Sequence, residues 1–293
     1  MASMRDIKRR KTSIQSTQQI TKAMKLVSTV KLQRAKSAAE RSKIYFNEMF
    51  ATVSSILERS ANINHPYLNN SGDGKKSVVV VTSNRGLAGG YNSNVTKLVT
   101  NDDRFSKDDT VIYAVGKKGK DTLQRKGFEI AADYTEVINA PLYSDAIDIC
   151  NTLLEAYKKG EISEIYLAYT VFKNTVSQVP TMLKLLPVDL DAAKDVKELK
   201  DDETYSVKAI MNFEPEEEEA LDLIIPKYVT SLLYGAMIEA VASENGARMQ
   251  AMDNATSNAE EMIQDLELGY NRARQAHITQ ELTEIIGGAE ALS

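Results

Sequence analysis

The sequence predicts a central α/β domain flanked by two long terminal helices that pair as an antiparallel coiled coil. Three features of the 293-residue chain predict this fold. Proline is absent from both ends and glycine from the first, the two ends carry opposite charges, and strand-like and helix-like segments alternate between them. With 43% hydrophobic and 26% charged residues, the composition is typical of a folded globular or coiled-coil protein rather than a disordered one.

The positions of proline and glycine divide the chain. All six prolines lie between residues 66 and 226, and the first glycine is Gly72. Proline costs ~3 kcal/mol inside a helix and glycine ~1 kcal/mol, so long helices are permitted only at the two ends. The sequence therefore predicts an N-terminal helix in residues 1–65, an α/β domain in 66–226 and a C-terminal helix in 227–293. At 1.5 Å per residue each helix would be roughly 85–90 Å long, so both must project from the domain and cover each other.

Hydrophobic spacing predicts the contact face of each helix. In the N-terminal helix, Ile20, Met24 and Val27 fall at i, i+4 and i+7, and a second set continues the pattern with Phe46, Phe50, Val53 and Leu57. In the C-terminal helix the spacing is heptad-like, with small residues where two helices could approach closely. The predicted contact residues of that helix are Met252, Ala259, Ile263, Leu266, Tyr270 and Ala273.

Charge supports the pairing of the two helices. Residues 1–65 carry 13 basic and 4 acidic side chains, whereas residues 227–293 carry 4 basic and 10 acidic ones. Opposite net charge favours association of the two rods in addition to their apolar faces. Two unrelated solvated helices are the alternative.

Between the rods the pattern indicates a Rossmann-like α/β domain with a mostly parallel sheet. Strands are expected at 77–82, 110–116 and 165–172, with helices at 93–101, 117–126 and 144–159. Segments 179–186 and 207–213 are candidates for further antiparallel strands. The polar stretch 189–203 is expected to be a mobile loop, and the acidic stretch 214–222 to begin a helix, because negative charge is favourable at a helix N-terminus.

Composition also limits the chemistry. Cys150 is the only cysteine, so no intramolecular disulfide can form, and with only His65 and His277 a Cys/His zinc site is nearly excluded. Neither histidine has a neighbourhood that suggests a catalytic base, so no enzyme site and no cofactor are expected. No uninterrupted apolar run reaches the ~18 residues of a membrane span, and the N-terminus lacks an apolar signal core. The sequence therefore predicts neither secretion nor a direct membrane span.

A glycine-rich stretch, residues 83–91, follows the first predicted strand and precedes a helix. Phosphates often bind at this place in α/β domains, but the stretch matches neither common phosphate-binding pattern. The favoured interpretation is a tight turn that needs positive φ angles. A small-ligand-binding α/β enzyme with a coiled-coil arm remains the alternative.

The first 43 residues are strongly basic, with 12 basic and 2 acidic side chains. Such a helix could follow a nucleic-acid backbone. However, its charges surround the helix, and it has no aromatic residue before Tyr45. An acidic protein partner, together with the acidic C-terminal helix, explains the charge as well. A nucleic-acid-binding tether is the second alternative.

Four stretches resemble the gamma subunit of F-type ATP synthases of the bacterial type. Residues 14–27 (IQSTQQITKAMKLV) and 270–289 (YNRARQAHITQELTEIIGGA) resemble the signatures at the two ends of that family. Residues 85–92 (RGLAGGYN) and 243–252 (SENGARMQAM) resemble its other recurring stretches, in the same order. Many relatives have aspartate where this chain has Asn84, and some have cysteine where it has Ala88.

The resemblance implies a non-catalytic rotary shaft. In this family the coiled coil enters a ring of alternating alpha and beta subunits, and the α/β domain sits against the epsilon subunit and the membrane rotor ring. The shaft couples ion flow to ATP synthesis or hydrolysis, while its partners bind the nucleotide. The implied location is peripheral, on the cytoplasmic face of the bacterial plasma membrane.

The resemblance also implies which residues contact the partners. Arg274 and Gln275 match a pair that hydrogen-bonds to a loop of one beta subunit, and Met24 matches the position that faces an acidic segment of beta. The other implied coupling positions are Lys22, Lys25, Arg248, Thr279, Glu281 and Glu284. The apolar tip, residues 278–292, is expected to turn inside an apolar sleeve.

Overall fold

A five-stranded sheet organises residues 29–248, which form one of two compact units in the computed structural model of the chain. The second unit is formed by residues 1–28 and 249–293. The structure describes residues 4–59, 65–68, 72–188 and 217–291. The two long helices, α1 (Met4–Arg59) and α6 (Glu217–Ala291), each contribute residues to both units.

The sheet has the strand order β3-β2-β1-β4-β5. Strands β1 to β4 are parallel to their neighbours, and β5 runs antiparallel to β4 at one edge. The predicted α/β fold is therefore confirmed. The strands are β1 (Lys75–Val81), β2 (Thr110–Val115), β3 (Glu129–Asp133), β4 (Ile162–Phe172) and β5 (Gln178–Leu186).

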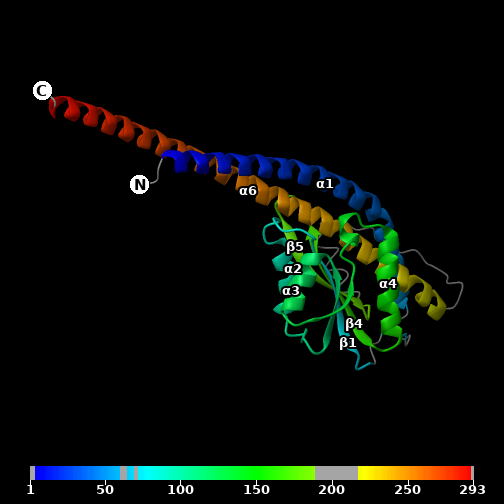
Figure 1. Cartoon of the computed structure of the whole chain (residues 1–293). Helices are drawn as coiled ribbons and strands as arrows, with labels where there is room; N and C mark the ends of the chain where they lie inside the picture. The colour runs from blue at the N-terminus through cyan, green and yellow to red at the C-terminus, as the bar shows by residue number, and fades with distance from the viewer. Residues whose placement is uncertain (1–3, 60–64, 69–71, 189–216, 292–293) are drawn as a thin grey trace. The chain divides into compact units, whose positions relative to one another are not determined.

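Helices cover both faces of the sheet, as Figure 1 shows. They are α2 (Tyr91–Thr100), α3 (Lys117–Arg125) and α4 (Tyr143–Lys158), with the short 3₁₀ helix η1 (Val137–Asn139) before α4. Because side chains alternate along a strand, Val78 and Val80 pack toward α2 and α3, whereas Val79 and Val81 pack toward α4 and α6. This two-sided burial explains why β1 is an unbroken β-branched run.

Strand β3 was not predicted from the sequence. It reads Glu-Ile-Ala-Ala-Asp, is half exposed and lies at the edge of the sheet. Alanine and the acidic residues have low strand propensity, so the strand depends on its pairing with β2 and on the packing of Ile130 and Ala132 against the core. The predicted strand 207–213 and the predicted loop 189–203 lie outside the described residues.

Helix α6 begins at Glu217, ten residues before the predicted start at 227, and contains Pro226. The acidic residues at its start agree with the predicted helix beginning within 214–222. Pro226 lacks the N–H that would bond to the preceding turn. Burial of Leu221, Ile225 and Tyr228 in the sheet core offsets that cost.

Cys150 on α4 gives a pH-dependent test of this packing. Burial raises the pKa of its thiol to about 11, partly opposed by the Thr230 hydroxyl. The thiol is therefore more easily ionised in the unfolded chain, and its contribution to stability is complete below about pH 9 and lost as the pH rises toward 11. We expect Cys150→Ala to lose less stability than the unmodified chain between pH 9 and 11, by about 2–3 kcal/mol. Thermal unfolding of both proteins across this range measures the difference, and parallel curves would contradict it.

Candidate functional site

The two helices pair in opposite directions within the unit formed by residues 1–28 and 249–293. Lys11 forms an ion pair with Glu267 at 2.7 Å, and Lys25 forms one with Asp253 at 2.6 Å. Between these pairs, the hydroxyls of Thr21 and Thr256 hydrogen-bond at 2.7 Å. As the residue number along α1 rises, the number of the residue that it contacts on α6 falls. The predicted antiparallel pairing is therefore confirmed in this unit.

The face of α1 that packs against α6 is not the predicted one. Ile20 is 58% exposed and Val27 57% exposed, so the interpretation of these two residues as contact residues is wrong. Thr21 and Ser28 are buried instead, and Ile14 is half-buried. Small hydroxyl-bearing residues allow close approach of the helices, and the Thr21–Thr256 hydrogen bond satisfies the polar groups that this approach buries.

The face of α6 agrees with the prediction. Met252 and Ala259 are buried, and the remaining four predicted contact residues are half-buried, namely Ile263, Leu266, Tyr270 and Ala273. In the N-terminal set, Val53 is buried in the core of the α/β domain. The side chains of Phe46, Phe50 and Leu57 lie outside what the structure describes.

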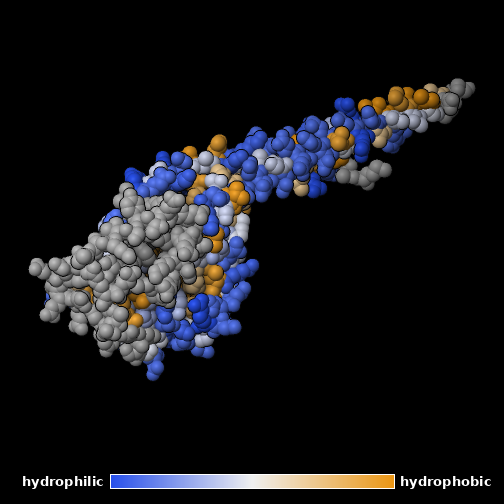
Figure 2. Space-filling view, turned by 180° about the vertical axis from the view of Figure 1, so that it is seen from behind, coloured by the Kyte–Doolittle hydropathy of each residue, from blue (hydrophilic) through white to orange (hydrophobic). Residues whose placement is uncertain are grey.

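Helix α6 extends beyond the part of it that pairs with the described residues of α1. Extrapolation of the register places Met4, the first described residue of α1, opposite Arg274. The turns that follow carry an apolar stripe, visible at the C-terminal end of the helix in Figure 2. Its exposed fractions run from 48% to 67% for Ile278, Leu282, Ile285 and Ile286. Exposed apolar surface of this kind marks an interaction site.

Five of the six implied coupling residues of α6 lie on this last stretch, and Arg248 is the exception. Arg274, Gln275, Thr279, Glu281 and Glu284 are all exposed. Their recorded contacts are local: Thr279 donates to the carbonyl of Gln275 at 2.9 Å, and Glu284 accepts from Gln280 at 2.9 Å. These side chains are therefore accessible to a partner.

The three implied residues of α1 differ in their surroundings. Lys22 is exposed, whereas Met24 is half-buried. Lys25 is engaged by Asp253, although both side chains remain substantially exposed. An exposed pair of this kind contributes ~0–1 kcal/mol, so it can be exchanged for another acidic partner at little cost.

The glycine-rich loop 83–91 is a braced tight turn in the α/β domain. Gly89 has φ +56° and Leu87 has φ +63°, which confirms the predicted need for positive φ. The backbone N–H of Ser83 donates to the side chain of Asn92 at 2.9 Å, and that of Tyr91 to the Ala88 carbonyl at 3.2 Å. These donors are used within the loop rather than presented to a phosphate.

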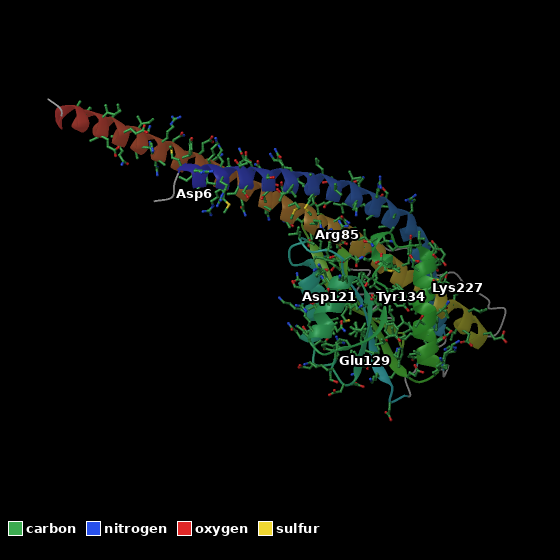
Figure 3. All side chains as sticks on the ribbon, in the orientation of Figure 1. Asp6, Arg85, Asp121, Glu129, Tyr134 and Lys227 are labelled. Atoms are coloured by element: carbon green, nitrogen blue, oxygen red, sulfur yellow. The ribbon has the colours of Figure 1, made fainter. Side chains whose placement is uncertain are left out.

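Arg248 lies inside the α/β domain rather than on an accessible surface. It is 9% exposed and pairs with Glu244 at 2.6 Å. Its guanidinium also donates to the Gly86 carbonyl at 3.2 Å and lies 3.4 Å from the Arg85 carbonyl. Figure 3 shows Arg85 on the side of the domain where α6 passes. The structure therefore places Arg248 against the 83–91 loop.

Comparison with known proteins identifies the family. A family model described as ATP synthase matches residues 3–292. An ATP synthase gamma chain of Lachnoclostridium phytofermentans is 63% identical over 293 residues, covering 100% of both chains. The chain belongs to the ATP synthase gamma chain family. A gamma chain described as sodium ion specific, from Acetobacterium woodii, is 41% identical and covers 99% of both chains.

Solved structures agree with membership of the gamma chain family. A central stalk and c-ring structure of the mitochondrial ATP synthase of Tetrahymena thermophila matches with a TM-score of 0.56 at 28% identity. The match covers 80% of this chain and 99% of that one. A mitochondrial ATP synthase structure from Euglena gracilis shows the same fold, with a TM-score of 0.54 at 20% identity over 92% of this chain and 95% of that one. As a gamma chain, the protein is a central-stalk subunit of the membrane-associated F-type ATP synthase.

One helix passes a length and composition test for a membrane span. Within residues 219–289 an 18-residue window reaches a mean hydropathy of 1.3, and 61% of that window is buried inside the protein. The exclusion of a span by composition alone was therefore too strong. Burial in the core accounts for this hydropathy, because a helix that is hydrophobic all round is typical of a protein core as well as of a membrane span. Among the described residues, no group of three or more His, Cys, Asp or Glu side chains could hold a metal ion.

Sequence reasoning missed two residues that fasten α6 to the domain. Tyr91 donates through its hydroxyl to the Ala240 carbonyl at 3.1 Å, and Ser243 donates to the Thr170 carbonyl at 3.1 Å. Both side chains bond to backbone carbonyls, whose positions depend on the tertiary fold. Their membership of two family-like stretches was the only signal available in the sequence.

Proposed function

We propose that the chain is the rotary shaft that couples ion flow through a membrane rotor ring to ATP synthesis and hydrolysis in an alpha/beta catalytic head. The observation that carries this proposal is the antiparallel pairing of α1 with α6, with α6 continuing beyond it as a single exposed helix. A paired stem gives lateral stiffness, and the single tip presents both charged and apolar side chains. The ATP chemistry belongs to the partners, and the shaft itself has no catalytic site and binds no cofactor.

The proposed partners occupy different parts of the chain. Residues 1–65 and 227–293 form the coiled-coil helices that face the alpha and beta subunits, and residues 66–226 form the domain that faces the epsilon subunit and the rotor ring. The protein is peripheral, held at the cytoplasmic face of the plasma membrane through the complex and without a span of its own. The buried apolar window of α6 supports this last point, because its hydrophobic surface is already covered.

The proposed contacts on α6 follow from its exposed tip. Arg274 and Gln275 carry donors that suit a backbone loop of one beta subunit, and both are exposed where the paired stretch ends. Thr279, Glu281 and Glu284 extend this polar contact along the helix. The stripe that begins at Ile278 turns within an apolar sleeve, where few directional contacts oppose rotation.

The proposed contact on α1 is electrostatic. Lys22 and the exchangeable Lys25 surround Met24 with positive charge, which suits an acidic segment of beta. Arg248 acts differently, because it is buried. We propose that Arg248 contributes to coupling without contacting a partner, by bonding α6 to the carbonyls of the 83–91 loop.

Charge reversal tests the proposed contact of α1. We expect Met24→Glu to impair coupling, because it places an anion beside an acidic segment, while the complex still assembles. The measurement is ATP-driven ion pumping relative to ATP hydrolysis in membrane vesicles. Met24→Leu retains the size of the side chain without charge and serves as the control. Wild-type coupling in Met24→Glu would contradict the placement of this residue.

Purification tests the proposed function as a whole. The chain is tagged in its own cell, extracted gently from membranes, and assayed for ATPase activity and co-purifying proteins. The proposal predicts two larger partners in threefold excess and hydrolysis that the isolated chain lacks. A chain that emerges alone, or with nucleic acid and no ATPase activity, would contradict it.

A further inference from the structure

Within the α/β domain, the part of helix α6 just before residue 248 lies between two segments of the chain that both contact it. On one side, two polar side chains join α6 to the loop 83–92, one from the loop and one from α6 itself. The Tyr91 hydroxyl donates to the Ala240 carbonyl at 3.1 Å, and Arg248 donates to the Gly86 carbonyl at 3.2 Å. The loop is itself braced, because Asn92 bonds to both the backbone and the hydroxyl of Ser83. Its contacts with α6 therefore come from a preorganised support.

The end of β4 and the turn that follows it hold the other side of α6. Ser243 donates to the Thr170 carbonyl at 3.1 Å. At Gly246 an added Cβ would lie 3.4 Å from both the Phe172 ring and the Gln178 amide, so alanine would fill the space between the helix and the ends of β4 and β5. Gln178 is fixed in turn by its bond to the Thr175 carbonyl at 2.9 Å. A side chain larger than alanine at Gly246 would push this turn away from the helix.

These contacts surround the helix rather than line one face. At 100° per residue, Gly246 and Arg248 point about 160° apart, and Ser243 lies within about 60° of Gly246. The apolar residues of α6 also pack on the sheet, but hydrophobic contact is non-directional and therefore less sensitive than a hydrogen bond to a small rotation of the helix. Hydrogen bonds weaken steeply when their geometry changes. The polar contacts and the close approach at Gly246 therefore fix the rotational setting of α6.

We propose that Tyr91, Ser243, Gly246 and Arg248 form a torque clamp, a set of positioning residues that prevents α6 from slipping about its axis within the α/β domain. This inference rests on the proposed rotary function, because only a shaft under torsional load needs such a lock. The domain is the part that faces the rotor ring, and α6 is the part that enters the head. The contacts between α6 and the domain are therefore one route by which torque passes between them.

The residues of the clamp are buried, so their hydrogen bonds are protected from competition with water. Tyr91 is 5% exposed, so water does not compete for its hydrogen bond. Burial, together with the nearby Glu244 carboxylate, raises the pKa of its hydroxyl well above the usual value, so the donor stays protonated. The Glu244–Arg248 pair is also largely buried, and breaking such a pair is strongly unfavourable.

The test compares two matched double variants in the complete ATP synthase reconstituted into vesicles. Tyr91→Phe with Ser243→Ala removes two side-chain hydrogen bonds of the clamp and leaves its volume nearly unchanged. Tyr157→Phe with Ser163→Ala is the control, because it removes the same two kinds of bond elsewhere in the domain, to the carbonyls of Pro66 and Gly74. Both pairs are expected to assemble and to hydrolyse ATP.

The clamp predicts that ions pumped per ATP hydrolysed fall about twofold or more in the clamp variant, because two lost bonds favour a slipped arrangement by roughly 10–100-fold. The control should match the unmodified complex. An equal fall in both variants would show a general loss of stability and overturn the clamp, as would unchanged pumping in the clamp variant. Should the double variant not assemble, Tyr91→Phe alone removes a single oxygen atom and must show the same direction of change. Absence of hydrolysis with the unmodified chain would instead refute the proposed function, and the clamp with it.

Discussion

Replacing Gly116 with alanine is expected to destabilise the α/β domain by more than about 4 kcal/mol. Gly116 precedes α3 with φ +112°, and a Cβ there would overlap the Thr82 carbonyl oxygen. Thr82, just after β1, and the start of α3 pack closely against each other, since the Thr82 hydroxyl also accepts a hydrogen bond from the Gly119 N–H at 2.8 Å. The overlap cannot be relieved by rotation of a side chain. Urea or thermal unfolding of the isolated chain measures the loss.

Gly127→Ala is the matched control for Gly116→Ala. Gly127 also has a positive φ, +89°, but the nearest atom to an added Cβ is the Lys107 Cδ at 3.7 Å. The control therefore has only the conformational cost, about 1–2 kcal/mol. Equal stability of the two variants would show that the junction at Thr82 adapts, and that close packing there is not required.

Placing proline in the paired stretch of α6 is expected to abolish coupling. Ala259 is 5% exposed at the contact with α1, and Ala259→Pro would remove a hydrogen bond of the helix and kink it, at a cost of ~3 kcal/mol or more. A kinked stem can neither maintain the pairing nor transmit torque. We expect ATP-driven ion pumping to be lost, and helical content measured by circular dichroism to fall.

The control places proline where the same helix tolerates it. Glu219 is exposed in the first turn of α6, where the backbone N–H has no partner within the helix. Glu219→Pro should therefore pump ions like the unmodified complex. If Ala259→Pro pumped equally well, a continuous paired stem would not be needed for coupling, and the account of the shaft would be wrong.

The sequence predicted those elements whose residues are stable in only one environment, buried in the core or against another helix. The buried run of β1 and the apolar face of α6 are of this kind, since Val79 or Met252 can be covered only by the core or by another helix. The distribution of proline likewise indicated both long helices, although Pro226 proved to lie inside α6 rather than before it. The burial of the surrounding residues outweighs the local preference of proline.

The remaining features depend on tertiary contacts that hydrophobic spacing cannot reveal. On α1 the buried residues are Thr21 and Ser28, while Ile20 and Val27 point outward. The buried hydroxyls of Thr21 and Thr256 are satisfied by each other and by carbonyls of their own helices, which no apolar pattern indicates. Apolar residues on the exposed face of α1 are consistent with a further interaction surface, which the pattern of apolar residues does not distinguish from the face that contacts α6.

The candidate site shows the same limit. Resemblance to the family indicated Arg248, but its buried position and its bonds to the 83–91 loop appear only in the fold. Tyr91 and Ser243 have no individual motif, because their partners are backbone carbonyls far away in the sequence. The role of the glycine-rich loop was predicted better, since positive φ is a local property of the chain.

Direct observation of rotation is the decisive test of the proposed rotary function. The catalytic head of the purified complex is fixed to a surface, and a bead is attached to the domain through Gln124→Cys on the exposed side of α3. The native Cys150 is buried and does not compete for the label. The account predicts that ATP drives the bead in one direction, with reversal only under an opposing ion gradient. A stationary bead on complexes that hydrolyse ATP at the full rate would contradict it.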